Sequence, residues 1–278
     1  MKNAAGVLLL MLAIGASFAA TQVRDNARLR PGLSTAADVP GTCHNDTLWM
    51  ENELALAELT PGVSCYSVHT SEVLWTRQLT GILTKQHDRP TPEMLAGQYS
   101  RICNDPARLS RYIGQDSVGY PYNITTYPRY PSAPEWRAGL RTVRCMGSAW
   151  YHLGDSRATL DFPLRNAWKA AASATIRLCA DASGGYLPCN QLHVQEVLEP
   201  LDPFPASQKK FPSPALSRRL GLAPCTEIAL KFLGVSRLPT DLHVVVEPAE
   251  QQNWAHSHDV GCRIASPLRV GSLQAGLT

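Results

Sequence analysis

One short pattern occurs twice in this chain of 278 residues and limits the possible folds more than any other feature. The pattern is Cys-x3-His-x2-Glu-Val, which we call the signature; one copy runs from Cys65 to Val73 and the other from Cys189 to Val197. Further markers recur after each copy in the same order: a cysteine near a helix, a tryptophan, a cysteine in an alternating strand and a glycine. This repeated order predicts an internal duplication in which each copy is one folding unit.

The repeat predicts two units and three connecting or terminal segments. We expect the units at residues 41–161 and 176–278, joined by a linker helix at 162–175. Residues 1–19 have a basic start, an apolar middle and a small-residue end, as signal peptides do, and residues 20–40 suit a flexible stem. The apolar run is also close to the shortest length that crosses a bilayer, so an uncleaved membrane anchor is the alternative.

Each unit is expected to have an α+β fold, in which a small antiparallel sheet carries one main helix. Alternation of apolar residues predicts strands at 72–75 and 140–146 of the first unit. Residues 120–134 are rich in tyrosine and proline, and this composition predicts that no regular structure continues there for long.

The main helix of each unit is expected beside a cysteine. In the first unit, Asp105 and Pro106 suit the N-cap and the first helical position, and Gly114 suits the C-cap. In the second unit, the same reasoning predicts a helix that starts at Pro224 and ends at Gly234.

All eight cysteines follow the apolar N-terminal run, which predicts a disulfide framework in an oxidising compartment. No Cys-x2-Cys pair occurs, so a zinc site is the weaker interpretation. Four cysteines in a unit allow three connectivities, and spacing alone does not select one. The expected positions of strands and helices favour four bonds within the units: Cys43 with Cys65, Cys103 with Cys145, Cys179 with Cys189, and Cys225 with Cys262.

Each signature pairs a histidine with a glutamate three residues later: His69 with Glu72, and His193 with Glu196. Such a pair can act as general acid and base, or it can supply two metal ligands. In this functional interpretation each pair lies at the mouth of a cleft that binds zinc or a cell-wall peptide. The favoured interpretation is structural, with the imidazole bonded to the glutamate or to backbone groups that would otherwise be unsatisfied. Because neither signature has an obvious third ligand, we assign no metal, no cofactor and no catalytic residue.

Two tryptophans, Trp136 and Trp254, precede the strand cysteines and are candidate sugar-binding residues. A tryptophan just before a core strand is more often a packing anchor, which is the favoured interpretation. His256 and His258 have no counterparts in the first unit and are expected in an exposed loop. Serine-nucleophile, Walker and dinucleotide-binding motifs do not occur, so the sequence contains no complete catalytic set.

The charge balance argues against a nucleic-acid partner. The chain has 26 basic and 23 acidic residues, and no stripe of lysine and arginine is interleaved with aromatic residues. Hydrophobic residues make up 44% of the composition, which is typical of a chain that folds.

The ordered set of signature, helical cysteine and tryptophan ahead of a Val-x-Cys strand resembles the septum-formation domain family of actinobacterial envelope proteins, present here as two tandem copies. Members of the family commonly have proline before the signature histidine, where this chain has Val68 and Leu192. The resemblance implies an exported protein that faces the cell wall and is associated with growth or division. It implies as partner an envelope or divisome protein or a cell-wall component, with membrane contact only through an uncleaved N-terminal segment.

The sequence therefore predicts a secreted or membrane-anchored envelope protein that binds or scaffolds in septum formation and catalyses no reaction. The alternative is a metal-dependent hydrolase that acts on cell-wall material through one of the His and Glu pairs. A third possibility is a structural domain that presents its variable loops to a protein partner.

Overall fold

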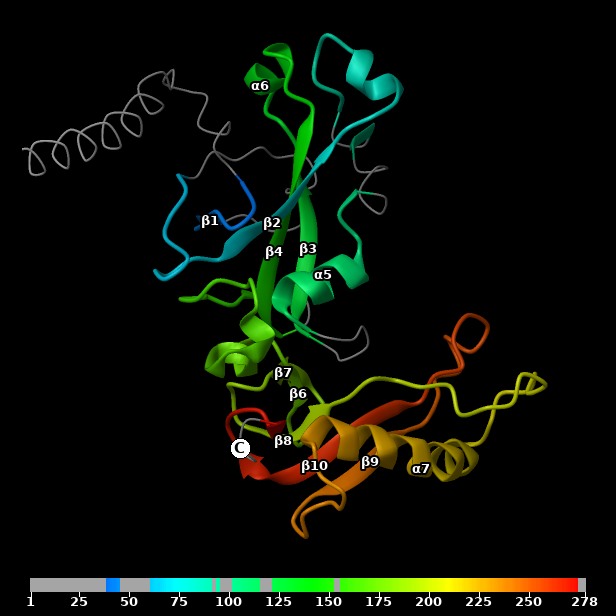
Figure 1. Cartoon of the computed structure of the whole chain (residues 1–278). Coiled ribbons are helices and arrows are strands. Elements are labelled where there is room, and N and C mark those ends of the chain that lie inside the picture. The colour runs from blue at the N-terminus through cyan, green and yellow to red at the C-terminus, as the bar shows by residue number, and fades with distance from the viewer. Residues whose placement is uncertain are drawn as a thin grey trace, which may run out of the picture. The chain divides into compact units, whose positions relative to one another are not determined.

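Two antiparallel sheets and a small number of helices make up the described part of the chain (Figure 1). The α+β class expected from the sequence is therefore confirmed. The expected signal segment at 1–19 and almost all of the stem at 20–40 lie outside the described residues. This computed structural model describes residues 39–45, 61–91, 94–95, 102–115, 122–152 and 156–274.

The first sheet has the strand order β1-β2-β4-β3, and β5 pairs with the end of β4. The long strands β2 and β4 lie at its centre. β2 includes the strand predicted at 72–75, whereas β4 begins two residues later than the strand predicted at 140–146 and extends beyond it. The strands are β1 (Cys43–His44), β2 (Ser71–Gln78), β3 (Ile124–Arg129), β4 (Thr142–His152) and β5 (Ser156–Arg157).

Strand β3, of six residues, lies within residues 120–134, where the sequence predicted no long regular element and no strand was assigned. The strand was not predicted because the position of Pro128 in the sheet decides whether a proline is tolerated there. β3 is the last strand in its sheet order, and a proline on an edge strand can leave its missing N–H on the unpaired side. Tyr127, one residue earlier, is 3% exposed and has the aromatic character that strands favour.

The second sheet has the order β7-β6-β8-β10-β9, so β6, β8, β10 and β9 follow the same order as β1, β2, β4 and β3. The pairing register agrees as well, because Cys43 lies opposite Glu72 and Cys179 lies opposite Glu196. The strands are β6 (Leu178–Ala180), β7 (Tyr186–Pro188), β8 (His193–Val197), β9 (His243–Glu247) and β10 (Gly261–Arg269).

The main helix of the first half, α5 (Pro106–Ile113), has the boundaries that its sequence signals predict. The Asp105 side chain accepts a hydrogen bond from the backbone N–H of Arg108, and Gly114 ends the helix with a φ of 82°. A short helix, α6 (Ala133–Arg137), precedes β4 and begins with a reciprocal capping box between Ser132 and Glu135.

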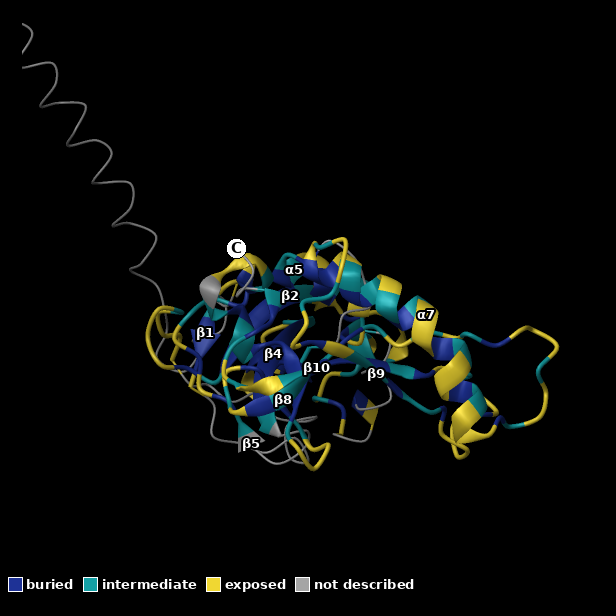
Figure 2. Ribbon diagram, turned by 90° about the horizontal axis from the view of Figure 1, so that it is seen from below, coloured by how far each residue is buried: buried dark blue, intermediate teal, exposed yellow. Residues whose placement is uncertain are grey.

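The main helix of the second half, α7 (Pro214–Leu233), starts earlier than the sequence predicted. Pro224 was expected at the first helical position, but it lies inside the helix; Pro214 occupies that position instead, and Ser213 is the N-cap. Two prolines thus carried the same local signal, and only one follows a capping residue. The helix packs on β9 and β10, and buried and exposed residues alternate along it (Figure 2).

The linker predicted as one helix at 162–175 contains two short 3₁₀ helices, η3 (Ala167–Lys169) and η4 (Ala171–Thr175). Asn166, with a φ of 60°, begins the first, and the extended Ala170 separates the two. These backbone conformations interrupt an alanine-rich segment whose composition alone favours a continuous helix. A further 3₁₀ helix, η2 (Ile82–Lys85), follows β2.

All four predicted disulfides are present, and two of them join a helical region to a central strand. Cys225 on α7 bonds to Cys262 on β10, and Cys103, in the turn before α5, bonds to Cys145 on β4. Each of these bonds lies in the larger hydrophobic cluster of its half.

Both sheets belong to one compact unit that begins at Val39. Among the described residues, no helix combines the length and apolar character needed to span a membrane.

Candidate functional site

The two signatures lie at the N-terminal ends of β2 and β8. A disulfide attaches the start of each signature to the adjacent strand: Cys65 to Cys43 on β1, and Cys189 to Cys179 on β6. The histidine and glutamate of both signatures are at most 1% exposed. The four side chains therefore lie inside the protein and not at the mouth of a cleft.

Each signature histidine bonds to the backbone two residues before it. The Nδ1 atom of His69 lies 2.8 Å from the carbonyl oxygen of Ser67, and Nδ1 of His193 lies 2.8 Å from that of Gln191. Because a carbonyl oxygen only accepts, Nδ1 carries the proton in both rings, and burial lowers the pKa of both imidazoles. The histidines are therefore neutral at pH 7 and close the turn that leads into each strand.

We expect acid to destabilise the protein through these two histidines. When folding lowers the pKa of a histidine, the neutral histidine stabilises the folded protein at pH values above the unfolded-state pKa of about 6.5. This stabilisation is lost as the pH falls, because the unfolded chain binds the proton at a higher pH than the folded chain does. A double variant, His69→Asn and His193→Asn, keeps an N–H donor at each turn but cannot titrate. Urea unfolding between pH 7.5 and pH 5 should show the wild type losing stability relative to this variant; parallel pH profiles would contradict the assignment.

Each signature glutamate accepts hydrogen bonds from a segment far along the chain. Glu72 accepts from the backbone N–H of Leu164 and from the hydroxyl of Tyr112. Glu196 accepts from the backbone N–H of Leu273 at 2.6 Å and from the hydroxyl of Ser272 at 2.8 Å.

Burial raises the pKa of both carboxyl groups, while these hydrogen bonds act in the opposite direction. Leu164 and Leu273 lie at different separations from the preceding strand cysteine, so sequence spacing could not identify them as counterparts. The glutamates therefore tie a distant loop to the sheet, and no hydrogen bond joins His to Glu within either signature of the described chain.

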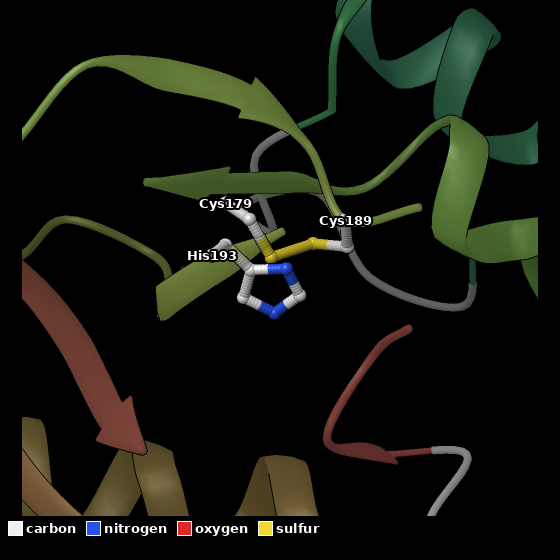
Figure 3. A group of neighbouring side chains, drawn as sticks. All are labelled: Cys179, Cys189 and His193. Carbon is white, nitrogen blue, oxygen red and sulfur yellow. A yellow bond between two sulfur atoms is a disulfide. The ribbon is translucent and has the colours of Figure 1, made fainter. Parts of the chain in front are cut away.

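Two side-chain clusters at the signatures have the proximity that metal ligands need. One contains Cys43, His69 and Glu72, and the other contains Cys179, Cys189 and His193 (Figure 3). The possible ligand atoms of each cluster lie within 4.8 Å of one another. All three cysteines are bonded in disulfides, however, and zinc binds the thiolate form of cysteine. In this oxidised chain the clusters fit a structural role better than a metal centre.

Trp136 and Trp254 are both buried, at 0% and 8% exposure, and serve as packing anchors. Their indole N–H groups donate to backbone carbonyls in corresponding loops, to Gln86 at 3.0 Å and to Lys209 at 3.3 Å. The guanidinium of Arg141 covers the first ring at 3.8 Å.

The Trp254 ring has aromatic neighbours on several sides, which limits its use for stacking on a sugar. Phe204 and Phe211 approach it edge-on, and the His258 ring stacks on it at 4.1 Å. Of the two expected loop histidines, His256 is exposed and His258 is partly buried by this stack.

A cleft of about 770 Å³ in the second half was not predicted from the sequence. Residues of β9, β10, α7 and the loop between β9 and β10 line it together with Tyr186 of β7. Its charged lining residues are Arg218, Glu247, Glu250, Asp259 and Arg263. These five residues have no common spacing or motif, because strand pairing and loop folding bring them together.

The signature, the tryptophans and the disulfides all fall within one match to a known family. The family described as septum formation matches residues 40–262, which include both signatures and all eight cysteines. The chain belongs to the septum-formation family. This membership relates it to septum formation in cell division. No curated protein and no solved structure matches the chain.

In this septum-formation protein the residues before the signature histidines, Val68 and Leu192, are both 60% exposed. The resemblance led us to expect proline at these two positions, so the departure from that expectation lies at surface sites. The neighbouring histidines are fully buried and keep the same backbone bond in both signatures. The departure therefore leaves the buried part of the septum-formation signature unchanged.

Proposed function

We propose that this chain is an exported protein of the actinobacterial cell envelope that acts in septum formation by binding or scaffolding, without catalysing a reaction. The family match over residues 40–262 carries this proposal. Four disulfides support the export, since such frameworks persist in oxidising compartments. Residues 1–19 would serve as its signal peptide or membrane anchor. Its partner would be an envelope or divisome protein, or a component of the cell wall.

The buried signatures support a role without catalysis. A hydrolytic metal site needs a position open to water and substrate, and usually three protein ligands. The His and Glu side chains of the described signatures are buried and bonded to their own chain, and the adjacent sulfurs form disulfides. Nothing in this geometry favours the hydrolase alternative.

We also infer that the two halves are copies of one duplicated unit. The strand orders agree, and Cys43 and Cys179 face the signature glutamates in the same register. The histidine and tryptophan bonds to the backbone recur in both halves as well. Shared bonds of this kind support descent from one unit more strongly than shared composition does.

The proposal predicts a division defect when the protein is depleted. We expect elongated cells with fewer septa, and enrichment at the septum of a fusion to a fluorescent protein that folds after export. Mass spectrometry of the envelope fraction should find the chain with its four disulfides. Normal septation after depletion, together with an even distribution of the fusion, would contradict the proposed function.

A further inference from the structure

The cleft in the second half lies over a position where the two sheets differ in chemistry. Arg263 follows the strand cysteine Cys262, and it lies opposite Val197 on β8 and Val245 on β9. The corresponding residue of the first sheet is Met146, which forms a buried apolar cluster with its two cross-strand neighbours. A buried cation thus replaces an apolar side chain at the same place in a similar sheet.

Arg263 forms the floor of the cleft and is only 4% exposed. One of its terminal nitrogens lies 2.5 Å from a carboxylate oxygen of Glu247 and donates to the Tyr186 hydroxyl at 3.1 Å. The other donates to the amide oxygen of Gln195 at 3.0 Å. Its Nε atom has no hydrogen-bond partner among the described residues.

Gly261 helps to fix this arrangement of Glu247 beside Arg263. A Cβ atom at Gly261 would lie 2.8 Å from the second carboxylate oxygen of Glu247, which is too close for a van der Waals contact. The glycine thus leaves room for the Glu247 carboxylate next to the guanidinium. Because Glu247 and Arg263 neutralise each other, neither provides a free charge for a ligand.

The remaining charges of the cleft are two carboxylates and one guanidinium. Glu250 accepts from the side-chain amide of Asn253 at 2.6 Å, and Asp259 accepts from the hydroxyl of Ser257 at 2.5 Å. Both are neutral donors, and no ion pair involves Glu250, Asp259 or Arg218 within the described chain. The cleft can therefore attract an ammonium group with its carboxylates and a carboxylate group with its guanidinium.

We propose that this cleft binds a short peptide that carries a free primary ammonium group and a carboxylate. The identification of its source as cell-wall peptide rests on the proposed envelope function. Valine and proline side chains along the wall would contact the apolar parts of such a peptide. At the position that corresponds to Arg263, the described part of the first sheet has the apolar Met146, so we assign the binding to the second half.

Calorimetric titration of the full chain, with its disulfides intact, tests the proposal. The probe is the tetrapeptide L-Ala-γ-D-Glu-L-Lys-D-Ala, compared with the same peptide acetylated on the lysine side chain and its N-terminus. The double variant Glu250→Gln and Asp259→Asn should raise the Kd of the free peptide at least about tenfold, because it removes both charged acceptors. Acetylation should weaken binding to the wild type to a similar extent.

Glu227→Gln is the matched control, because Glu227 is an exposed glutamate of α7 outside the cleft. This variant should bind as the wild type does. Equal binding by the wild type and the double variant would overturn the inference, and so would no binding to the wild type. Binding of Ca²⁺ in place of the peptide would also overturn it. These failures would leave the septal localisation and depletion results intact, so they are distinguishable from failure of the proposed function.

Discussion

Replacing both Cys225 and Cys262 by alanine should lower the free energy of unfolding by about 4 kcal/mol. The two residues are separated by 37 positions, and the loop-entropy model gives a penalty of this size for leaving such a loop open in the unfolded chain. Both side chains are also fully buried, so their truncation removes packing between α7 and β10. Chemical denaturation of the oxidised wild type and the double variant measures the difference.

The disulfide between Cys179 and Cys189 provides the matched comparison. Its sequence separation is only 10, so the same model predicts a smaller loss of about 3 kcal/mol for the corresponding double alanine variant. The order of the two losses tests the argument better than either value, because both variants remove two buried sulfurs. A larger loss at the short loop would contradict the entropic explanation.

Glu196→Ala should destabilise the protein by about 3 kcal/mol relative to Glu196→Gln. Alanine removes the acceptor of the Leu273 N–H and the Ser272 hydroxyl, and both groups lie in a buried region. Glutamine keeps an oxygen that can accept from Leu273 and removes the charge. Both variants lack the buried carboxylate. The difference between their free energies of unfolding therefore reports only the lost hydrogen bonds and the small cavity.

The same pair of variants predicts a pH dependence. Because burial raises the pKa of Glu196, its contribution to stability is present below the unfolded-state value and is lost as pH rises through the native value. The wild type should therefore lose stability relative to Glu196→Gln as pH rises from about 4 to 7. Urea midpoints of both proteins measure this change. A difference that stays constant with pH, or equal stability of the alanine and glutamine variants, would contradict the role given to Glu196.

Local sequence signals predicted those elements whose boundaries depend on a few adjacent residues. Helix α5 has the N-cap at Asp105 and the C-cap at Gly114 that its sequence indicates. Helix α7 was predicted to start too late because Pro214 and Pro224 carry the same local signal. Strand β3 was missed because a proline is compatible with a strand only where its nitrogen lies on an unpaired edge. Whether a strand lies at the edge or in the centre depends on how the whole sheet is assembled, and the sequence of the strand itself does not show it.

The sequence by itself determined the repeated signature and the α+β class, because both follow from short spacings and local patterns. It favoured the observed pairing of the cysteines only through the expected positions of strands and helices, and the structure decided among the connectivities. Tertiary structure alone decided that His69 and Glu72, with their counterparts His193 and Glu196, are buried and bonded to the backbone. It also decided the charged cleft around Arg263, whose lining comes from strands, a helix and a loop far apart in the chain. Burial and long-range contact depend on how the sheets pair and what packs on them, and neither quantity is encoded in local spacing.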